Sequence, residues 1–349
     1  MTDSVLDLSV GHADGRPSMT TQEAIDPMRA IAQDTYGASE TWRLTEMDKP
    51  EIKAEEVLVR VHAAGLDRGT WHTMTGRPYL MRMMGFGLRG PKNRVPGLAM
   101  AGTVAAVGSK VTRFAVGDEV YGVSRGAFAD YAAAREDKLA RKPSNLTFEQ
   151  AAAVPISATT AIQGLHAGRV EAGQKVLIIG ASGGVGTYAV QLAKAFGAEV
   201  TGVCSAAKID LVRSLGADHV IDYAEQDVTE GSGRYDLILD IAGNAPLRRL
   251  RGILTPRGTL VIVGGESKGN WTGGFGRSLR APVVSLFVRQ RLAMLVSTEK
   301  YADLDSLTEL IEAGKVAPSI DRIYRLDQAQ DAMRQLEAGH VRGKVVIAI

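Results

Sequence analysis

A glycine-rich turn follows directly after a short apolar run in the middle of the sequence. Residues 176–179 have the apolar, β-branched composition of a buried parallel strand, and apolar residues recur at helical spacing after the turn. A strand that leads through glycines into a helix N-terminus leaves backbone N–H groups free for an anion. We therefore predict that a dinucleotide pyrophosphate binds here. The residues assigned to it are Gly180, Ser182, Gly183, Gly184, Val185 and Gly186.

Strands and helices alternate after this turn. We expect strands at 199–203, 219–223, 235–241 and 259–263, and a helix over about 207–215. This alternation is typical of a doubly wound parallel sheet, whose ligand lies at the carboxyl ends of the strands. The later strand ends should therefore line the ribose and the nicotinamide. Their residues are Ala242, Gly243, Asn244, Gly264 and Gly265.

The end of the second strand lacks the carboxylate that binds the ribose 2′-hydroxyl in most NAD sites. The first acidic residue after this strand is Asp210, which falls inside the expected helix. A carboxylate would repel a 2′-phosphate, whereas Ser205, Lys208 and Tyr223 can bind one. We therefore predict NADPH as the cofactor. The alternative for Lys208 is a solvated lysine at the start of a helix.

Length and composition fit a two-domain enzyme. The chain has 349 residues, of which 45% are hydrophobic and 23% charged. A net charge of +2 is too small to indicate a nucleic-acid partner, and no apolar run is long enough for a transmembrane segment. The single cysteine, Cys204, fits a reducing compartment, so we expect a cytoplasmic protein.

The first part of the chain differs from the rest. Residues 1–27 carry scattered small and polar residues without sustained periodicity. We expect them to form a flexible tail or, alternatively, to precede the true first residue, Met28. Their several acidic residues argue against a transit peptide.

The remaining sequence divides into three segments. Residues 28–152 are β-rich, with valines that alternate with other residues over 57–61, and they predict a compact barrel-like domain. Residues 153–296 hold the nucleotide-binding sheet. Residues 297–349 contain a helix and two short strand-like segments, and we expect them to return to the first domain.

Several motifs together resemble the medium-chain dehydrogenase/reductase superfamily. They are the glycine turn, Gly-Asp-Glu-Val at 117–120 and Gly-His-Val-Arg-Gly-Lys-Val-Val at 339–346. Residues 64–67 and 215–223 are similar to the zinc-independent quinone oxidoreductase (zeta-crystallin-like) branch. The resemblance implies an α/β fold with a GroES-like β-rich catalytic domain and a Rossmann domain, a cleft between them, and a homodimer. It also implies that Arg342 and Lys344 bind the cofactor.

The sequence lacks an evident set of zinc ligands. A catalytic zinc needs about three Cys, His or carboxylate ligands, and a structural zinc needs four, mostly cysteines. Zinc-dependent members of the superfamily have a cysteine where this chain has Asp67, and Gly-His-Glu where residues 97–99 read Gly-Leu-Ala. We therefore expect no metal. Hydrogen bonds must then polarise the hydride acceptor, and a side chain or water must protonate it.

Residues 67–79 face the cleft in the family, so their polar side chains are catalytic candidates. Asp67 stands where quinone reductases carry Asn, and an ionised Asp can accept but not donate a hydrogen bond, which leaves its role open. His72 and Tyr79 are candidate proton donors; the alternative for His72 is a surface or stacking role. Thr160 resembles a threonine beside the nicotinamide, although helix N-capping would also explain it.

Two further segments are candidates for covering the acceptor. Residues 79–86 combine methionines with an arginine and suit a pliable apolar wall. Residues 271–292 are apolar and basic, and they form either a lid or a helix that packs on a partner subunit.

The sequence therefore predicts an NADPH-dependent, zinc-independent oxidoreductase. It would transfer hydride to a quinone or an α,β-unsaturated carbonyl compound. Two alternatives stay open. One is an NADP-dependent reductase of small carbonyls of the alcohol dehydrogenase type, and the other is a non-catalytic protein that retains NADPH.

Overall fold

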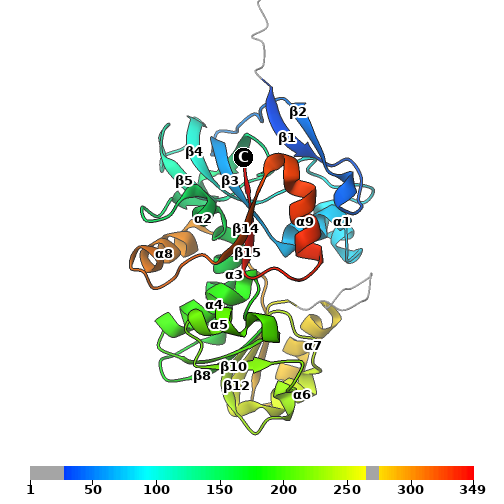
Figure 1. The fold of residues 1–349 in the computed structure, drawn as a ribbon, viewed down its shortest axis with the longest axis vertical. Helices are drawn as coiled ribbons and strands as arrows, with labels where there is room; N and C mark the ends of the chain where they lie inside the picture. Colours follow the sequence, from blue (N-terminus) through cyan, green and yellow to red (C-terminus); the bar gives the residue numbers. More distant parts are fainter. Residues whose placement is uncertain (1–26, 265–274) are drawn as a thin grey trace, which may run out of the picture.

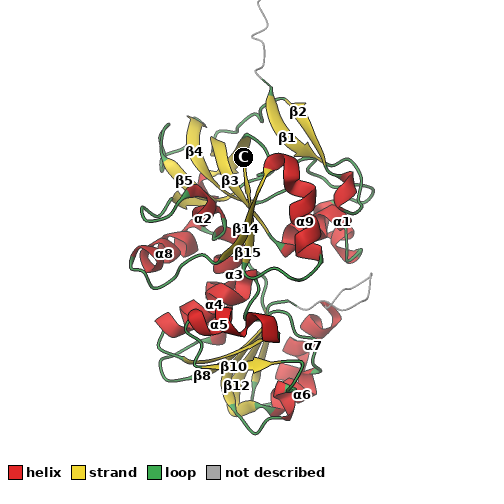
Figure 2. Cartoon of the chain, viewed as in Figure 1, coloured by secondary structure: helices red, strands yellow, loops and turns green. Residues whose placement is uncertain are grey.

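The computed structural model describes residues 27–264 and 275–349 (Figure 1). Most of the expected tail, Gly265 and the start of the 271–292 segment lie outside the described residues. The strands of the described part form a two-stranded, a six-stranded and a seven-stranded sheet (Figure 2). The chain thus combines a β-rich, GroES-like body with a Rossmann-like body, as the sequence predicts.

The β-rich body is built around β3 (Glu56–Leu66). This strand pairs antiparallel with β4 (Ala99–Val107), β6 (Tyr131–Arg135) and β15 (Lys344–Ala348). The alternating valines at 57–61 are buried, which confirms the predicted strand. Because β15 pairs with β3 and β14 (Ile320–Arg325) pairs with β15, the end of the chain returns to this body.

Shorter elements complete the β-rich body. The strands are β1 (Met28–Ala32), β2 (Arg43–Met47), β5 (Glu119–Val123) and β7 (Leu139–Arg141). The helices are α1 (Arg68–Thr75), a π-helical turn (Arg82–Phe86), α2 (Phe148–Ala152), α8 (Tyr301–Glu312) and α9 (Ala329–Glu337).

The Rossmann-like body holds six parallel strands in the order β10-β9-β8-β11-β12-β13. They are β8 (Lys175–Ile179), β9 (Glu199–Cys204), β10 (His219–Asp222), β11 (Tyr235–Asp240), β12 (Leu254–Ile262) and β13 (Arg291–Met294). The helices are α3 (Pro155–Gly168), α4 (Gly184–Ala195), α5 (Ile209–Ser214), α6 (Leu247–Gly252) and α7 (Phe275–Ser285). Separate buried clusters cover the two faces of this sheet.

Three predicted elements differ from the structure. The expected helix at 207–215 is a 3-10 turn followed by the short α5. The strand expected at 259–263 begins earlier, at Leu254. The segment 271–292 contains α7 and runs into the edge strand β13, which the sequence analysis missed because four residues show too little alternation.

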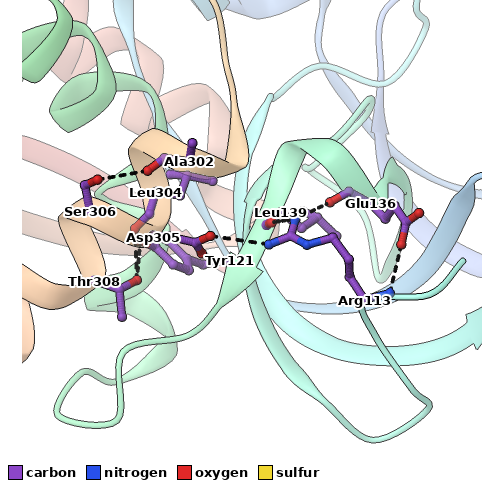
Figure 3. Close-up of polar contacts among 9 residues, drawn as sticks. All are labelled: Arg113, Tyr121, Glu136, Leu139, Ala302, Leu304, Asp305, Ser306 and Thr308. Atoms are coloured by element: carbon purple, nitrogen blue, oxygen red, sulfur yellow. Dashed lines mark hydrogen bonds and ion pairs between the residues drawn. The ribbon is translucent and has the colours of Figure 1, made fainter.

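The two bodies share one hydrophobic core, and hydrogen bonds attach α8 to the β-rich body. Buried residues of β3, β5, α4 and β8 belong to the same cluster. The buried Tyr121 hydroxyl lies 2.7 Å from Leu304 O and 2.9 Å from Thr308 Oγ1 on α8 (Figure 3). Arg113 donates to Leu139 O at 3.0 Å and lies 3.5 Å from Asp305 (Figure 3). These contacts hold α8, which follows the Rossmann-like body in the chain, against the β-rich body.

Candidate functional site

The glycine turn joins β8 to α4 and leaves an open surface. Gly180 has φ +90°, which favours glycine, and a Cβ on Gly186 would lie 2.1 Å from Gly180 O. By contrast, the nearest atom to a Cβ on Gly183 would be Gly180 O, at 3.6 Å. Thr187 N donates to Gly183 O, so the amides of the preceding first turn of α4 are available to a ligand. The space and the donors fit a pyrophosphate.

The end of the chain lies against this turn. Gly343 N donates to Ser182 O at 3.0 Å. The Lys344 side chain is buried, and its ammonium donates to Leu66 O at 2.9 Å. A Cβ on Gly184 would lie 3.0 Å from Lys344 Cδ, so the Lys344 side chain passes beside the N-terminus of α4. Burial lowers the pKa of Lys344, and the negative charge of Asp67 opposes this shift.

Asp67 is the N-cap of α1. Its Oδ1 accepts hydrogen bonds from Thr70 N at 2.9 Å and from Thr70 Oγ1 at 3.3 Å. Its Oδ2 is buried and has no hydrogen-bond partner among the described residues. A buried carboxylate oxygen without a donor is costly, and the nearby charge of Lys344 offsets part of this cost. Asp67 thus has a capping role that its residue type at a helix start could have indicated.

His72 closes the end of α1. Its Nδ1 lies 2.7 Å from Arg77 O, and because a carbonyl only accepts, Nδ1 carries the proton in this contact. The ring also meets Trp71 edge-on at 5.0 Å between centroids. This geometry matches the stacking role that the sequence left open.

Arg82 organises the segment that contains Tyr79. Its guanidinium lies 4.7 Å from the ring centroid of Tyr79 and 4.3 Å from that of Tyr36. It also donates to Gly76 O at 2.8 Å. The polar and cation–π contacts of Arg82 therefore hold the segment around Tyr79 in place, in addition to the methionines that the sequence places there.

Thr160 does not cap a helix. It lies within α3, whose N-cap is Val154, and its Oγ1 donates to Ile156 O at 2.7 Å. The N-capping alternative is therefore wrong. Thr160 Oγ1 also lies 3.5 Å from Ser297 Oγ, which belongs to the segment between β13 and α8.

Two positively charged side chains, Lys208 and Arg342, lie near each other at the expected 2′-phosphate site, at the end of β9. The Lys208 ammonium donates to Val341 O at 2.8 Å and to Gly339 O at 3.1 Å, which leaves one of its three N–H groups for a ligand. Burial lowers the pKa of Lys208, and the nearby Arg342 lowers it further. Lys208 is half-buried at the start of α5, and two backbone carbonyls replace part of its solvation. Ser205 is half-buried beside it, and Tyr223 is exposed.

The end of β11 meets the glycine turn, and the residues after β12 lie against the end of β11. A Cβ on Gly180 would lie 2.7 Å from the Cβ of Ala242, and Gly243 N donates to the buried Asp240 Oδ1 at 2.9 Å. Gly264 N donates to Asp240 O at 3.3 Å, and Asn244 continues the loop. Sequence reasoning missed Asp240, although a charged residue at the end of the apolar run 237–239 was a usable signal.

The described residues contain no group of three or more His, Cys, Asp or Glu side chains that could hold a metal ion. No helix among them is long and apolar enough to cross a membrane. Metal independence itself stays a prediction.

Comparison with known proteins identifies the family. Residues 53–144 match the alcohol dehydrogenase GroES-like domain, and residues 215–347 match the zinc-binding dehydrogenase family. A 2-methylene-furan-3-one reductase from Solanum lycopersicum is 31% identical over 99% of this chain and 86% of its own. An NADPH-dependent alkenal/one oxidoreductase, chloroplastic, from Arabidopsis thaliana is 33% identical over 92% of this chain and 79% of its own.

A solved structure agrees with these relatives. The quinone oxidoreductase from Coxiella burnetii is 29% identical, covers 93% of this chain and 100% of its own, and superposes with a TM-score of 0.82. Fold, glycine turn and relatives together define a two-domain oxidoreductase of the NAD(P)-binding class. The chain belongs to the medium-chain dehydrogenase/reductase superfamily, in its quinone oxidoreductase branch.

The glycine turn makes a specific prediction. Gly183→Val should raise the Kd for NADPH by roughly 100-fold, because the new side chain fills the space that the pyrophosphate needs. The fold should persist, since Gly183 has an extended backbone (φ −85°, ψ 176°) that valine readily adopts. Fluorescence titration with NADPH and circular dichroism measure the two effects.

The matched control is Gly252→Val, at a helix end where a Cβ meets no atom within 4 Å. It should leave NADPH binding unchanged. A folded Gly183→Val protein that binds NADPH like the wild type would contradict the pyrophosphate assignment.

Proposed function

We propose that this protein is an NADPH-dependent, zinc-independent oxidoreductase that reduces a quinone or an α,β-unsaturated carbonyl compound. The observation that carries the proposal is the open glycine turn beside the end of β9, where Lys208 and Arg342 lie close together and where the chain has no acidic residue after the strand before Asp210. The names of the tomato and Arabidopsis relatives, which specify a methylene-furanone and alkenal/one substrates, support the acceptor class.

The chain's own residues suit the successive parts of the cofactor. The amides of Gly180, Ala181 and Gly183 donate to backbone carbonyls, so the amides of the first turn of α4 would hold the pyrophosphate, with the Lys344 ammonium adding positive charge nearby. Ser205, Lys208, Tyr223 and Arg342 would hold the 2′-phosphate. The loop 242–244 and Gly264 would line the ribose and the nicotinamide. When bound, NADPH supplies the hydride.

The acceptor side needs hydrogen-bond donors and a proton source. Asp67 has its Oδ1 engaged in capping and can only accept, so it serves to orient a ligand. His72 and Tyr79 are the proposed proton donors, with water as the alternative source. Thr160 stands on the α3 side of the junction between the two bodies.

We also propose that the protein is a homodimer. β13 is the edge strand of the parallel sheet, and an unpaired strand edge is a template for a partner. Next to it, Leu286 and Phe287 expose 80% and 82% of their surface, which a dimer contact would cover. The cytoplasmic localisation stays a prediction.

Lys208 should determine cofactor preference. The wild type should bind NADPH at least about tenfold more tightly than NADH, and Lys208→Ala should remove most of this difference by weakening NADPH alone. Calorimetric titration with both cofactors measures it, with the exposed Lys315→Ala as the control. Equal or tighter NADH binding by the wild type would contradict the assignment. Equal weakening of both cofactors would indicate a structural role through Gly339 and Val341 instead.

Activity should survive metal removal. A quinone or enone accepts hydride without a Lewis acid when donors stabilise the developing charge, whereas a simple carbonyl is harder to reduce. We expect NADPH oxidation with a panel of quinones and enones to be unchanged after chelation, and elemental analysis to find far less than one zinc per chain. Loss of activity on chelation that zinc specifically restores would overturn the zinc-independent assignment.

A further inference from the structure

A buried ion pair lies behind the strand ends that face the cofactor. Asp240, the last residue of β11, is completely buried, and its Oδ2 lies 2.6 Å from the Arg277 guanidinium on α7. Burial raises the pKa of Asp240, and the neighbouring guanidinium opposes this shift. Two buried charges are retained only when each is well compensated. Because apolar residues of similar volume would avoid this cost, we expect the ion pair to have a role beyond packing.

The guanidinium also reaches two separate loops. Its Nη1 donates to Ala245 O at 2.9 Å, and its Nη2 donates to Gly243 O at 2.9 Å and lies 3.5 Å from Gly264 O. The first two carbonyls belong to the loop after β11, and the third belongs to the end of β12. The planar fork of arginine can span several such acceptors at once, which a lysine ammonium does less well.

The loop after β11 is also in contact with the glycine turn. Asp240 Oδ1 accepts from Gly243 N, and the adjacent Ala242 is so close to Gly180 that a Cβ on the glycine would come within 2.7 Å of it. Arg277 thus connects the loop that borders the turn with Gly264, without itself lying on the turn.

We propose that Arg277 is a positioning residue for the dinucleotide, held in place by Asp240. It holds the loop after β11 and Gly264 in the arrangement that receives the nicotinamide half of the cofactor. The proposal rests on the proposed function, because it assumes that NADPH binds at this edge of the sheet. It assigns Arg277 no contact with the reacting atoms.

The test compares full-length variants by their Kd for NADPH, their kcat at saturating NADPH and their melting temperature without cofactor. Arg277→Gln should raise the Kd by about tenfold with kcat nearly unchanged, and Arg277→Lys should give a smaller increase. The control Arg280→Gln removes an exposed arginine one turn along α7 and should behave like the wild type.

A double variant separates positioning from stability. Asp240→Asn combined with Arg277→Gln leaves no unpaired buried charge, so it should fold even if Arg277→Gln alone does not. Its Kd should still be about tenfold above that of the wild type, because the Arg277 contacts are absent. A wild-type Kd in the folded double variant, or a lowered melting temperature with unchanged Kd in Arg277→Gln, would overturn the proposal. Failure of the wild type to bind NADPH would overturn the proposed function and this inference with it.

Discussion

The buried ammonium of Lys344 constrains both halves of the molecule. Lys344 is the first residue of β15, which pairs with β3. The preceding residue, Gly343, donates a hydrogen bond to Ser182 O in the glycine turn. Burying a positive charge is costly unless it is compensated. Leu66 O accepts its hydrogen bond, and Asp67 supplies the opposite charge. Compensation therefore brings the end of β3 and the start of α1 to Lys344, whose side chain also passes beside the start of α4.

Other charged groups are also arranged around the expected cofactor site. Positive groups lie at two places along the expected cofactor, Lys344 near the turn and Lys208 with Arg342 near the end of β9. The carboxylate at the end of β11, Asp240, is neutralised by Arg277. The edge of the sheet is consequently favourable to a ligand that carries several phosphates.

The sequence predicted those features that depend on local pattern. The strand, glycine turn and helix at 176–195 and the alternating valines at 57–61 are short-range signals, and the structure has them where expected. Contacts between distant residues were not predictable in this way. Lys208 meets Val341 across 133 positions, and Arg277 meets Asp240 through a fold that must already be in place.

Some side chains have roles that only three-dimensional neighbours define. The sequence places Arg82 in a methionine-rich segment. In the structure its cation–π partners include Tyr36, which lies much earlier in the sequence. Thr160 reads as a helix cap because threonine favours that position, yet Pro155 starts the helix earlier. In both cases residue type was informative, and the missing information was the location of the surrounding backbone.

The most direct test of the account is isotope transfer from NADPH to an enone. NADPH deuterated at the 4-position is incubated with the protein and an enone, and the product is examined by nuclear magnetic resonance. The account predicts deuterium on the β-carbon of the saturated product. Deuterium on the carbonyl carbon, or tight NADPH binding with no transfer to any enone or quinone tested, would contradict it.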